Sequence, residues 1–214
     1  MILTEDKFWS SSFVLSMVGS GDKYKRFCSV HGVQPRVVYG LNTSSDYIFD
    51  LKFNQTNLID LETQYYINRY SGVVGCHMNH FYAIQYAFMN DYEFVVILED
   101  DVEMADGLDG LIEAATELPD DFDALVFGWI PSIAFNERKK VPKEYSSRLY
   151  LVDGLDRSGA FGYLLSRNGM KMALTVLSDI RVPSDLQFKY MNSFYTKTPV
   201  FNHPPAYAPS RIRK

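Results

Sequence analysis

Short apolar runs alternate along the chain with more polar or amphipathic segments. The runs predict strands over residues 13–18, 36–40, 94–98, 122–128 and 149–152, and a further strand ending near residue 166. The segments between them predict helices over residues 23–28, 76–90, 108–118 and 170–177, and another helix starting at about residue 183. The alternation predicts an α/β fold that opens with a βαβ unit.

Two connecting regions lack a clear apolar pattern. Residues 41–70 are polar, and we expect an excursion with one short helix around residues 60–67. Residues 131–148 carry several charges and few apolar anchors. They predict either a mobile loop that closes over a substrate or a plain surface loop.

The first predicted strand runs into a glycine-rich turn, and Asp22 can cap the helix that follows. A strand, such a turn and a helix N-terminus often receive a nucleotide phosphate in α/β proteins. Neither a Gly-x-Gly-x-x-Gly fingerprint nor a P-loop is present, so this signal is weak. Arg26 in this helix either reaches a phosphate or lies on a solvated helix face.

The helix predicted over residues 76–90 has an apolar stripe that we expect to face the core, made of Met78, Phe81, Tyr82, Phe88 and Met89. His77 and His80 lie three residues apart, so we expect them to share a different face. Their spacing suits a metal-binding pair, and hydrogen-bonded histidines near a helix start are the simpler interpretation.

The main chemical signal follows the apolar run 94–98, where Glu99, Asp100 and Asp101 stand in succession. The run predicts a strand buried on both faces, and chemistry in open α/β sheets gathers beyond the carboxyl ends of such strands. Adjacent carboxylates repel one another and are costly to desolvate without a cation. A divalent metal holding a phosphate-bearing substrate would compensate them. A solvated acidic turn is the alternative, and the buried strand in front favours the metal site.

Composition narrows the class of protein. A chain of 214 residues with 47% hydrophobic residues predicts one soluble domain, and a net charge of -5 argues against a nucleic-acid binder. Cys28 and Cys76 fit no zinc or disulfide framework, so we expect reduced thiols. No run reaches transmembrane length and no signal-peptide pattern opens the chain. We therefore expect a cytoplasmic protein, or one domain of something larger.

Three blocks, in order, resemble glycosyltransferase family 25, which includes bacterial lipooligosaccharide galactosyltransferases and collagen hydroxylysine galactosyltransferases. Residues 75–80 (GCHMNH) are similar to the family's Gly-Cys-x-x-Ser-His, with Asn79 in place of Ser, and residues 97–101 (ILEDD) are similar to its Leu-Glu-Asp-Asp. Residues 159–169 (GAFGYLLSRNG) resemble its small-residue loop, strand and Ser-x-x-Gly-Ala segment, with Met170 where Ala is commoner. A Pro-x-Asp follows at residues 183–185. The first strand lacks the usual Asn-Leu and Asp-Arg, which leaves donor and acceptor identity open.

The resemblance implies a GT-A fold, a Rossmann-like mixed sheet flanked by helices, that uses a UDP-sugar with Mn²⁺ or Mg²⁺. Glu99 and Asp101 are then the expected metal ligands. His203 is either a late third ligand or a surface histidine. Asp100 is expected at the ribose or a neighbouring backbone group.

The resemblance also implies residues that contact the two substrates. Asn79 and His80 are expected at hydroxyls of the donor sugar. Gly159 belongs to the segment 158–162, which would line the acceptor side and allow close approach. Family members are regarded as inverting, so a carboxylate should deprotonate the acceptor hydroxyl. Asp185 is the candidate base and Asp156 the runner-up, although helix capping alone also explains Asp185.

We therefore predict an enzyme that moves a hexose, galactose or glucose by preference, from a UDP-sugar to a glycan, lipooligosaccharide or glycoprotein acceptor. A single domain over residues 1–214 is expected, with a donor half at 13–130 and an acceptor half at 131–205. A metal-dependent nucleotidyl or phosphoryl transferase could use the same acids. A non-catalytic carbohydrate-binding module is a third possibility, given 15 Tyr and 15 Phe.

Overall fold

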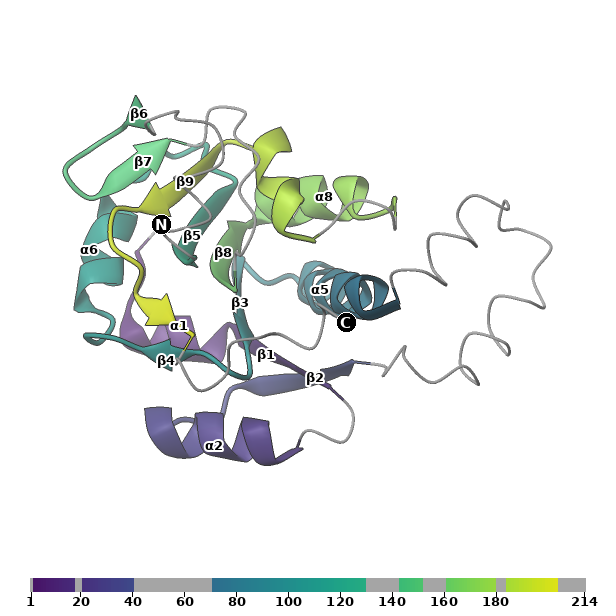
Figure 1. Ribbon diagram of the computed structural model, residues 1–214. Coiled ribbons are helices and arrows are strands. Elements are labelled where there is room, and N and C mark those ends of the chain that lie inside the picture. Colours follow the sequence, from purple (N-terminus) through teal and green to yellow (C-terminus); the bar gives the residue numbers. More distant parts are fainter. Residues whose placement is uncertain are drawn as a thin grey trace.

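The computed structural model describes residues 2–17, 21–40, 71–129, 143–151, 161–179 and 184–203. Within these ranges the strands form one ten-stranded mixed sheet (Figure 1). Its strands are β1 Ser12–Met17, β2 Arg36–Gly40, β3 Phe94–Glu99, β4 Glu103–Met104, β5 Ala124–Gly128, β6 Lys143–Glu144, β7 Leu149–Leu151, β8 Gly162–Ser166, β9 Ser193–Thr196 and β10 Phe201–Asn202. The described helices are α1 Glu5–Ser10, α2 Gly21–His31, α5 Ser71–Met89, α6 Asp109–Thr116, α8 Arg167–Val176 and the 3₁₀ helix η1 Ser184–Tyr190.

The strand order is β2-β1-β3-β8-β5-β9-β7-β6, with β10 pairing both β5 and β4. Strand β1 runs parallel to β2 and to β3, which confirms the predicted βαβ opening. Strand β8 lies antiparallel between β3 and β5. The predicted mixed α/β sheet flanked by helices is therefore the observed architecture.

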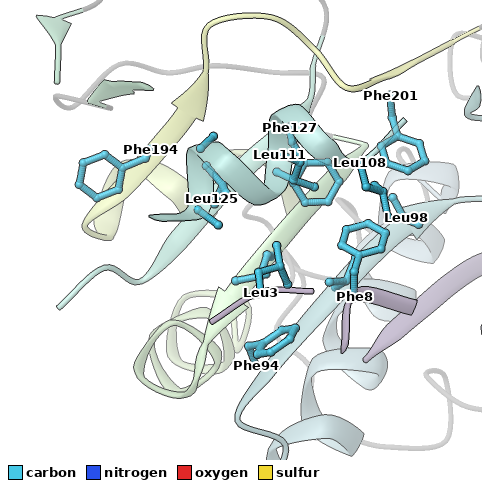
Figure 2. Packing of buried hydrophobic residues seen from close by; sticks show 14 of the residues in the cluster. Leu3, Phe8, Phe94, Leu98, Leu108, Leu111, Leu125, Phe127, Phe194 and Phe201 are labelled. Atoms are coloured by element: carbon cyan, nitrogen blue, oxygen red, sulfur yellow. The ribbon is translucent and has the colours of Figure 1, made fainter. Parts of the chain in front are cut away.

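The core divides into two layers because the residues of β3 alternate between the faces of the sheet. Phe94, Val96 and Leu98 belong to the cluster that packs under α1, α2 and α6, part of which Figure 2 shows. Val95 and Ile97 belong to the cluster under α5, α8 and η1. All five side chains are at most 3% exposed. Each contributes about 1.5–3 kcal/mol by burial, so the central strand is held firmly from both sides.

Helix α5 differs from its prediction in its start and in its buried face. It begins at Ser71, so residues 71–75 belong to the helix and do not precede it. The predicted core stripe is wrong for Tyr82 and Met89, which are 45% and 73% exposed, whereas Phe81 and Phe88 are partly buried and pack against the core as expected. The fully buried face carries aliphatic, small and polar residues: Val74, His77, Asn79, His80, Ala83, Ile84 and Ala87. Large aromatic residues lie at the rim because the helix packs closely on β3 and α8.

Several shorter elements also differ from the expectation. Helix α1 and strands β4 and β9 have no predicted counterpart, and β6 lies inside the region predicted as a loop. Helix α8 begins at Arg167 because the Ser166 side chain accepts a hydrogen bond from the Gly169 amide and caps it. Asp22 lies in the first turn of α2, not at its cap.

The excursion expected over residues 41–70 lies outside the described residues, as does most of the loop expected over 131–148. The division into donor and acceptor halves stays a prediction. No described helix has both the length and the apolar character needed to cross a bilayer.

Candidate active site

The three acids lie where parallel strands end side by side. Glu99 is the last residue of β3, and its amide donates to the Phe161 carbonyl at 3.1 Å. The Asp100 amide donates to the Leu15 carbonyl of β1, also at 3.1 Å. Main-chain bonds to both neighbouring strands therefore fix the acids at the sheet edge before any side chain acts.

Asp100 is held by one side chain from β1 and one from α2. Ser16 Oγ donates to Asp100 Oδ2 at 2.5 Å, and Lys23 Nζ lies 3.6 Å from Oδ1. Burial raises the pKa of the Asp100 carboxyl above its ordinary value, and these two partners offset part of the rise. Sequence reasoning missed both partners. The only available signal was their position, at the end of a strand and in the first turn of the next helix.

Asp101 lies between the side chains of Lys23 and His203. Lys23 Nζ is 3.1 Å from Oδ2, and His203 Nδ1 is 3.3 Å from Oδ1. Burial alone would raise the pKa of Asp101, but His203 and Lys23 outweigh it and hold the pKa below its ordinary value. Burial would likewise lower the pKa of His203, yet Asp101 and Glu99 raise it.

His203 reaches this position because β10 returns the end of the chain to the sheet. Phe201 and Asn202 pair antiparallel with β4, immediately after the acids. The imidazole then packs on the Phe161 ring, with centroids 4.1 Å apart, and its Nε2 lies 3.9 Å from Glu99 Oε2. The fold thus brings together all three predicted metal-site residues.

Glu99, Asp101 and His203 each offer one ligand atom, and these atoms lie within 4.8 Å of one another. Among the described residues, Asp101 Oδ1 is buried without a hydrogen-bond partner. Burial, with repulsion from Asp101, raises the pKa of Glu99 to about 7. A divalent cation would bind this oxygen and relieve the repulsion between the two acids, and their two carboxylates suit Mn²⁺ or Mg²⁺.

Asp185 approaches the same cluster from η1. It is half-buried in the first turn, and its charge contributes to the raised pKa of Glu99. Its neighbour Ser184 lies with Oγ 3.8 Å from Cys76 Sγ on α5. The starts of η1 and α5 therefore meet the end of β3. Asp156 and Gly159 lie outside the described residues.

Asn79 and His80 are buried in α5, where His80 is 1% exposed. His80 Nδ1 lies 2.6 Å from the Tyr163 hydroxyl, and burial, with the nearby His77, lowers its pKa to about 3. His77 Nε2 hydrogen-bonds the Leu177 carbonyl at 2.8 Å. Both histidines thus have hydrogen-bond partners on other elements, and the role of Asn79 and His80 at the donor sugar stays a prediction.

Arg26 lies on α2 and pairs with Glu103. It lines a shallow depression together with Lys23, Asp100 and Asp101. The depression joins basic groups of α2 to the acids at the end of β3. This combination of cationic side chains and a candidate cation site is suited to an anionic, phosphate-bearing substrate.

Comparison with known proteins gives one family. Residues 57–188, more than half of the chain, match the sequence model of glycosyltransferase family 25 (LPS biosynthesis protein). No curated protein matches the chain.

Several solved structures match the chain at low sequence identity. A197 from STIV is 12% identical, with a TM-score of 0.44 over 86% of this chain and 79% of that one. HddC from Yersinia pseudotuberculosis is 14% identical, with a TM-score of 0.42 over 89% of this chain and 91% of that one. A glycosyltransferase involved in glycosylation of the major capsid of PBCV-1 is 12% identical, with a TM-score of 0.37 over 78% of this chain and 65% of that one.

Proposed function

The chain belongs to glycosyltransferase family 25, and on that basis we propose that it is a metal-dependent, inverting enzyme. It moves a hexose, galactose or glucose by preference, from a UDP-sugar to a glycan, lipooligosaccharide or glycoprotein acceptor. The observation that carries this proposal is the convergence of Glu99, Asp101 and His203 at the end of β3.

Glu99, Asp101 and His203 hold the cation, Mn²⁺ or Mg²⁺. Once bound, the cation supplies positive charge that stabilises the diphosphate leaving group. Asp101 Oδ1 is buried without a hydrogen bond among the described residues. The group that lies nearest to it in the cluster, His203 Nδ1 at 3.3 Å, belongs to a proposed ligand itself. A site of this kind is preorganised for binding.

Residues around Asp100 position the nucleotide. Ser16 and Lys23 fix the Asp100 carboxylate, so one acceptor is presented in a defined direction to the ribose or to a backbone group. Arg26 lies beside the same depression and supplies a guanidinium for phosphate oxygens. Asn79 and His80 of α5 contribute to the donor-sugar side.

Asp185 is the base that accepts the proton of the acceptor hydroxyl during a single displacement at the anomeric carbon. Its place beside the cluster supports this role, because the negative charge of Asp185 contributes to the raised pKa of both Glu99 and Cys76. Asp156 is the second candidate. Gly159 belongs to the acceptor side.

The experiment measures UDP released from a panel of UDP-sugars with Mn²⁺, Mg²⁺ or EDTA. We expect slow hydrolysis of one donor by the wild type, lost in EDTA and in Asp101→Asn, but kept in Asp106→Asn, which removes an exposed carboxylate elsewhere. Nucleotide release from nucleoside triphosphates instead would favour a nucleotidyl or phosphoryl transferase. Activity that survives both EDTA and Asp101→Asn would refute the metal role.

A second measurement separates the base from the metal site. Asp185→Asn should abolish transfer to an acceptor while UDP and Mn²⁺ still bind with nearly unchanged affinity. Near-normal transfer by this variant would show that another group, Asp156 first, accepts the proton.

A further inference from the structure

A second group of possible ligands shares Glu99 with the first. Cys76, His80 and Glu99 each offer one ligand atom, and the three atoms lie within 4.8 Å of one another. Cys76 and His80 are four residues apart in α5, so they occupy adjacent turns on the same helix face. Glu99 reaches them from the end of β3 and is common to both groups.

The surroundings of His80 leave one ring nitrogen available to a cation. Its Nδ1 lies 2.6 Å from the Tyr163 hydroxyl, and the two rings stack at 5.7 Å. When Nδ1–H donates to the Tyr163 oxygen, Nε2 carries the lone pair. A buried partner on the second nitrogen is the usual arrangement for a histidine that ligates a metal. Tyr163 is itself 1% exposed, so it fixes the orientation of the imidazole.

The chemistry of these ligands differs from that of the first group. Burial, with the charge of Glu99, raises the pKa of the Cys76 thiol to about 12, so a cation must displace its proton to bind the sulfur. The resulting thiolate and the imidazole select Zn²⁺ and similar borderline cations, whereas Mg²⁺ and Mn²⁺ prefer oxygen ligands. Three protein ligands also leave a fourth tetrahedral position open. The Glu99 side chain is 34% exposed while His80 is 1% exposed, so a cation would enter along Glu99.

We infer that Cys76, His80 and Glu99 form a binding site for Zn²⁺ that takes Glu99 away from the candidate catalytic cation. Zinc therefore antagonises the enzyme by occupying a shared ligand. The antagonism rests on the proposed function, whereas the binding site itself does not.

The binding site is tested with Co²⁺, which reports thiolate ligation through a charge-transfer absorption in the near ultraviolet. The full chain is titrated as wild type, Cys76→Ser and Cys28→Ser. Cys28 is the matched control, because it is a second free cysteine on a different helix, α2. We expect the band in wild type and Cys28→Ser and its loss in Cys76→Ser.

The wild-type titration decides the question even if Cys76→Ser folds poorly. Co²⁺ held by Glu99, Asp101 and His203 alone has no sulfur ligand and gives no such band. Absence of the band in wild type, or a band that disappears in Cys28→Ser and persists in Cys76→Ser, would overturn the site.

The antagonism is tested by adding Zn²⁺ to the UDP-release assay at a fixed Mn²⁺ concentration. Wild type and Cys28→Ser should be inhibited at the same Zn²⁺ concentration, and Cys76→Ser should require about tenfold more or higher. Equal inhibition of all three would refute the shared-ligand mechanism. If no donor is hydrolysed under any condition, the proposed function fails while the Co²⁺ spectrum still decides the site.

Discussion

Replacing Glu99 with Gln should make the metal-free protein more stable at alkaline pH while it removes metal binding. Glu99 is an acid held in a place that disfavours its charge. Burial and the Asp101 carboxylate raise its pKa from 4.5 to about 7. Glutamine keeps the shape of the side chain and removes the charge, so the variant no longer carries this electrostatic cost.

The magnitude follows from the linkage between protonation and folding. A pKa that rises from 4.5 to about 7 on folding corresponds to about 3.4 kcal/mol, at 1.36 kcal/mol per pKa unit. The side chain is 34% exposed, so solvent screening reduces the expected effect to about 1–2 kcal/mol. Between pH 4.5 and about 7 the folded state binds more protons than the unfolded state. Stability of the wild type therefore falls as pH rises through this window, and the full penalty is present above it.

The assay is urea unfolding in EDTA at pH 5 and at pH 8. Glu99→Gln should exceed the wild type by about 1–2 kcal/mol at pH 8 and by much less at pH 5. Adding Mn²⁺ should then stabilise the wild type at pH 8 and leave the variant unchanged, because only the wild type keeps the ligand.

Glu93→Gln is the matched control, since Glu93 is an exposed carboxylate just before the start of the same strand. It should leave both the stability difference between the two pH values and the response to Mn²⁺ as in the wild type. Equal stability of Glu99→Gln and wild type at pH 8, or the same gain at both pH values, would refute the buried-charge reasoning.

Two further predictions concern the packing and the support of the site. A Cβ at Gly169 would lie 1.9 Å from the Asp123 carbonyl oxygen, so Gly169→Ala should lower the free energy of unfolding by about 1–3 kcal/mol. Gly110→Ala, with nothing within 4 Å, should raise it by up to about 1 kcal/mol, and equal urea midpoints for the two variants would contradict the clash. Ser16→Ala removes the charged hydrogen bond to Asp100 and should cost about 1.5–3 kcal/mol; an unchanged unfolding midpoint would show that this bond contributes nothing.

The central part of the site could be predicted because its signal is local. An apolar run followed directly by three acids places Glu99 and Asp101 at the end of a buried strand whatever the rest of the chain does. The prediction of His203 as a possible ligand came from the family resemblance. Its approach to Asp101 depends on the pairing of β10 with β4. Lys23 and Ser16 carry no distinguishing pattern, since a lysine in a first helical turn is usually solvated.

The helices also show that local features could be predicted from the sequence and tertiary contacts could not. The helix over residues 76–90 was predicted, but its buried face was not, because side-chain size gives the wrong order of burial. Tyr82 and Met89 lie outside while His77 and His80 lie inside. The close contact with β3 and α8 excludes large side chains. Partners such as the Tyr163 hydroxyl and the Leu177 carbonyl satisfy the buried imidazoles.

By itself, the sequence determined the alternating α/β pattern, the βαβ opening and the acids at the end of the central strand, because each depends on neighbours within a few positions. Only the tertiary structure decided that His203 faces Asp101 and Glu99, that Lys23 pairs with the acids, and that Cys76 and His80 share Glu99 with them. These contacts join residues up to about a hundred positions apart. Strand pairing and core packing, which no local pattern records, bring them together.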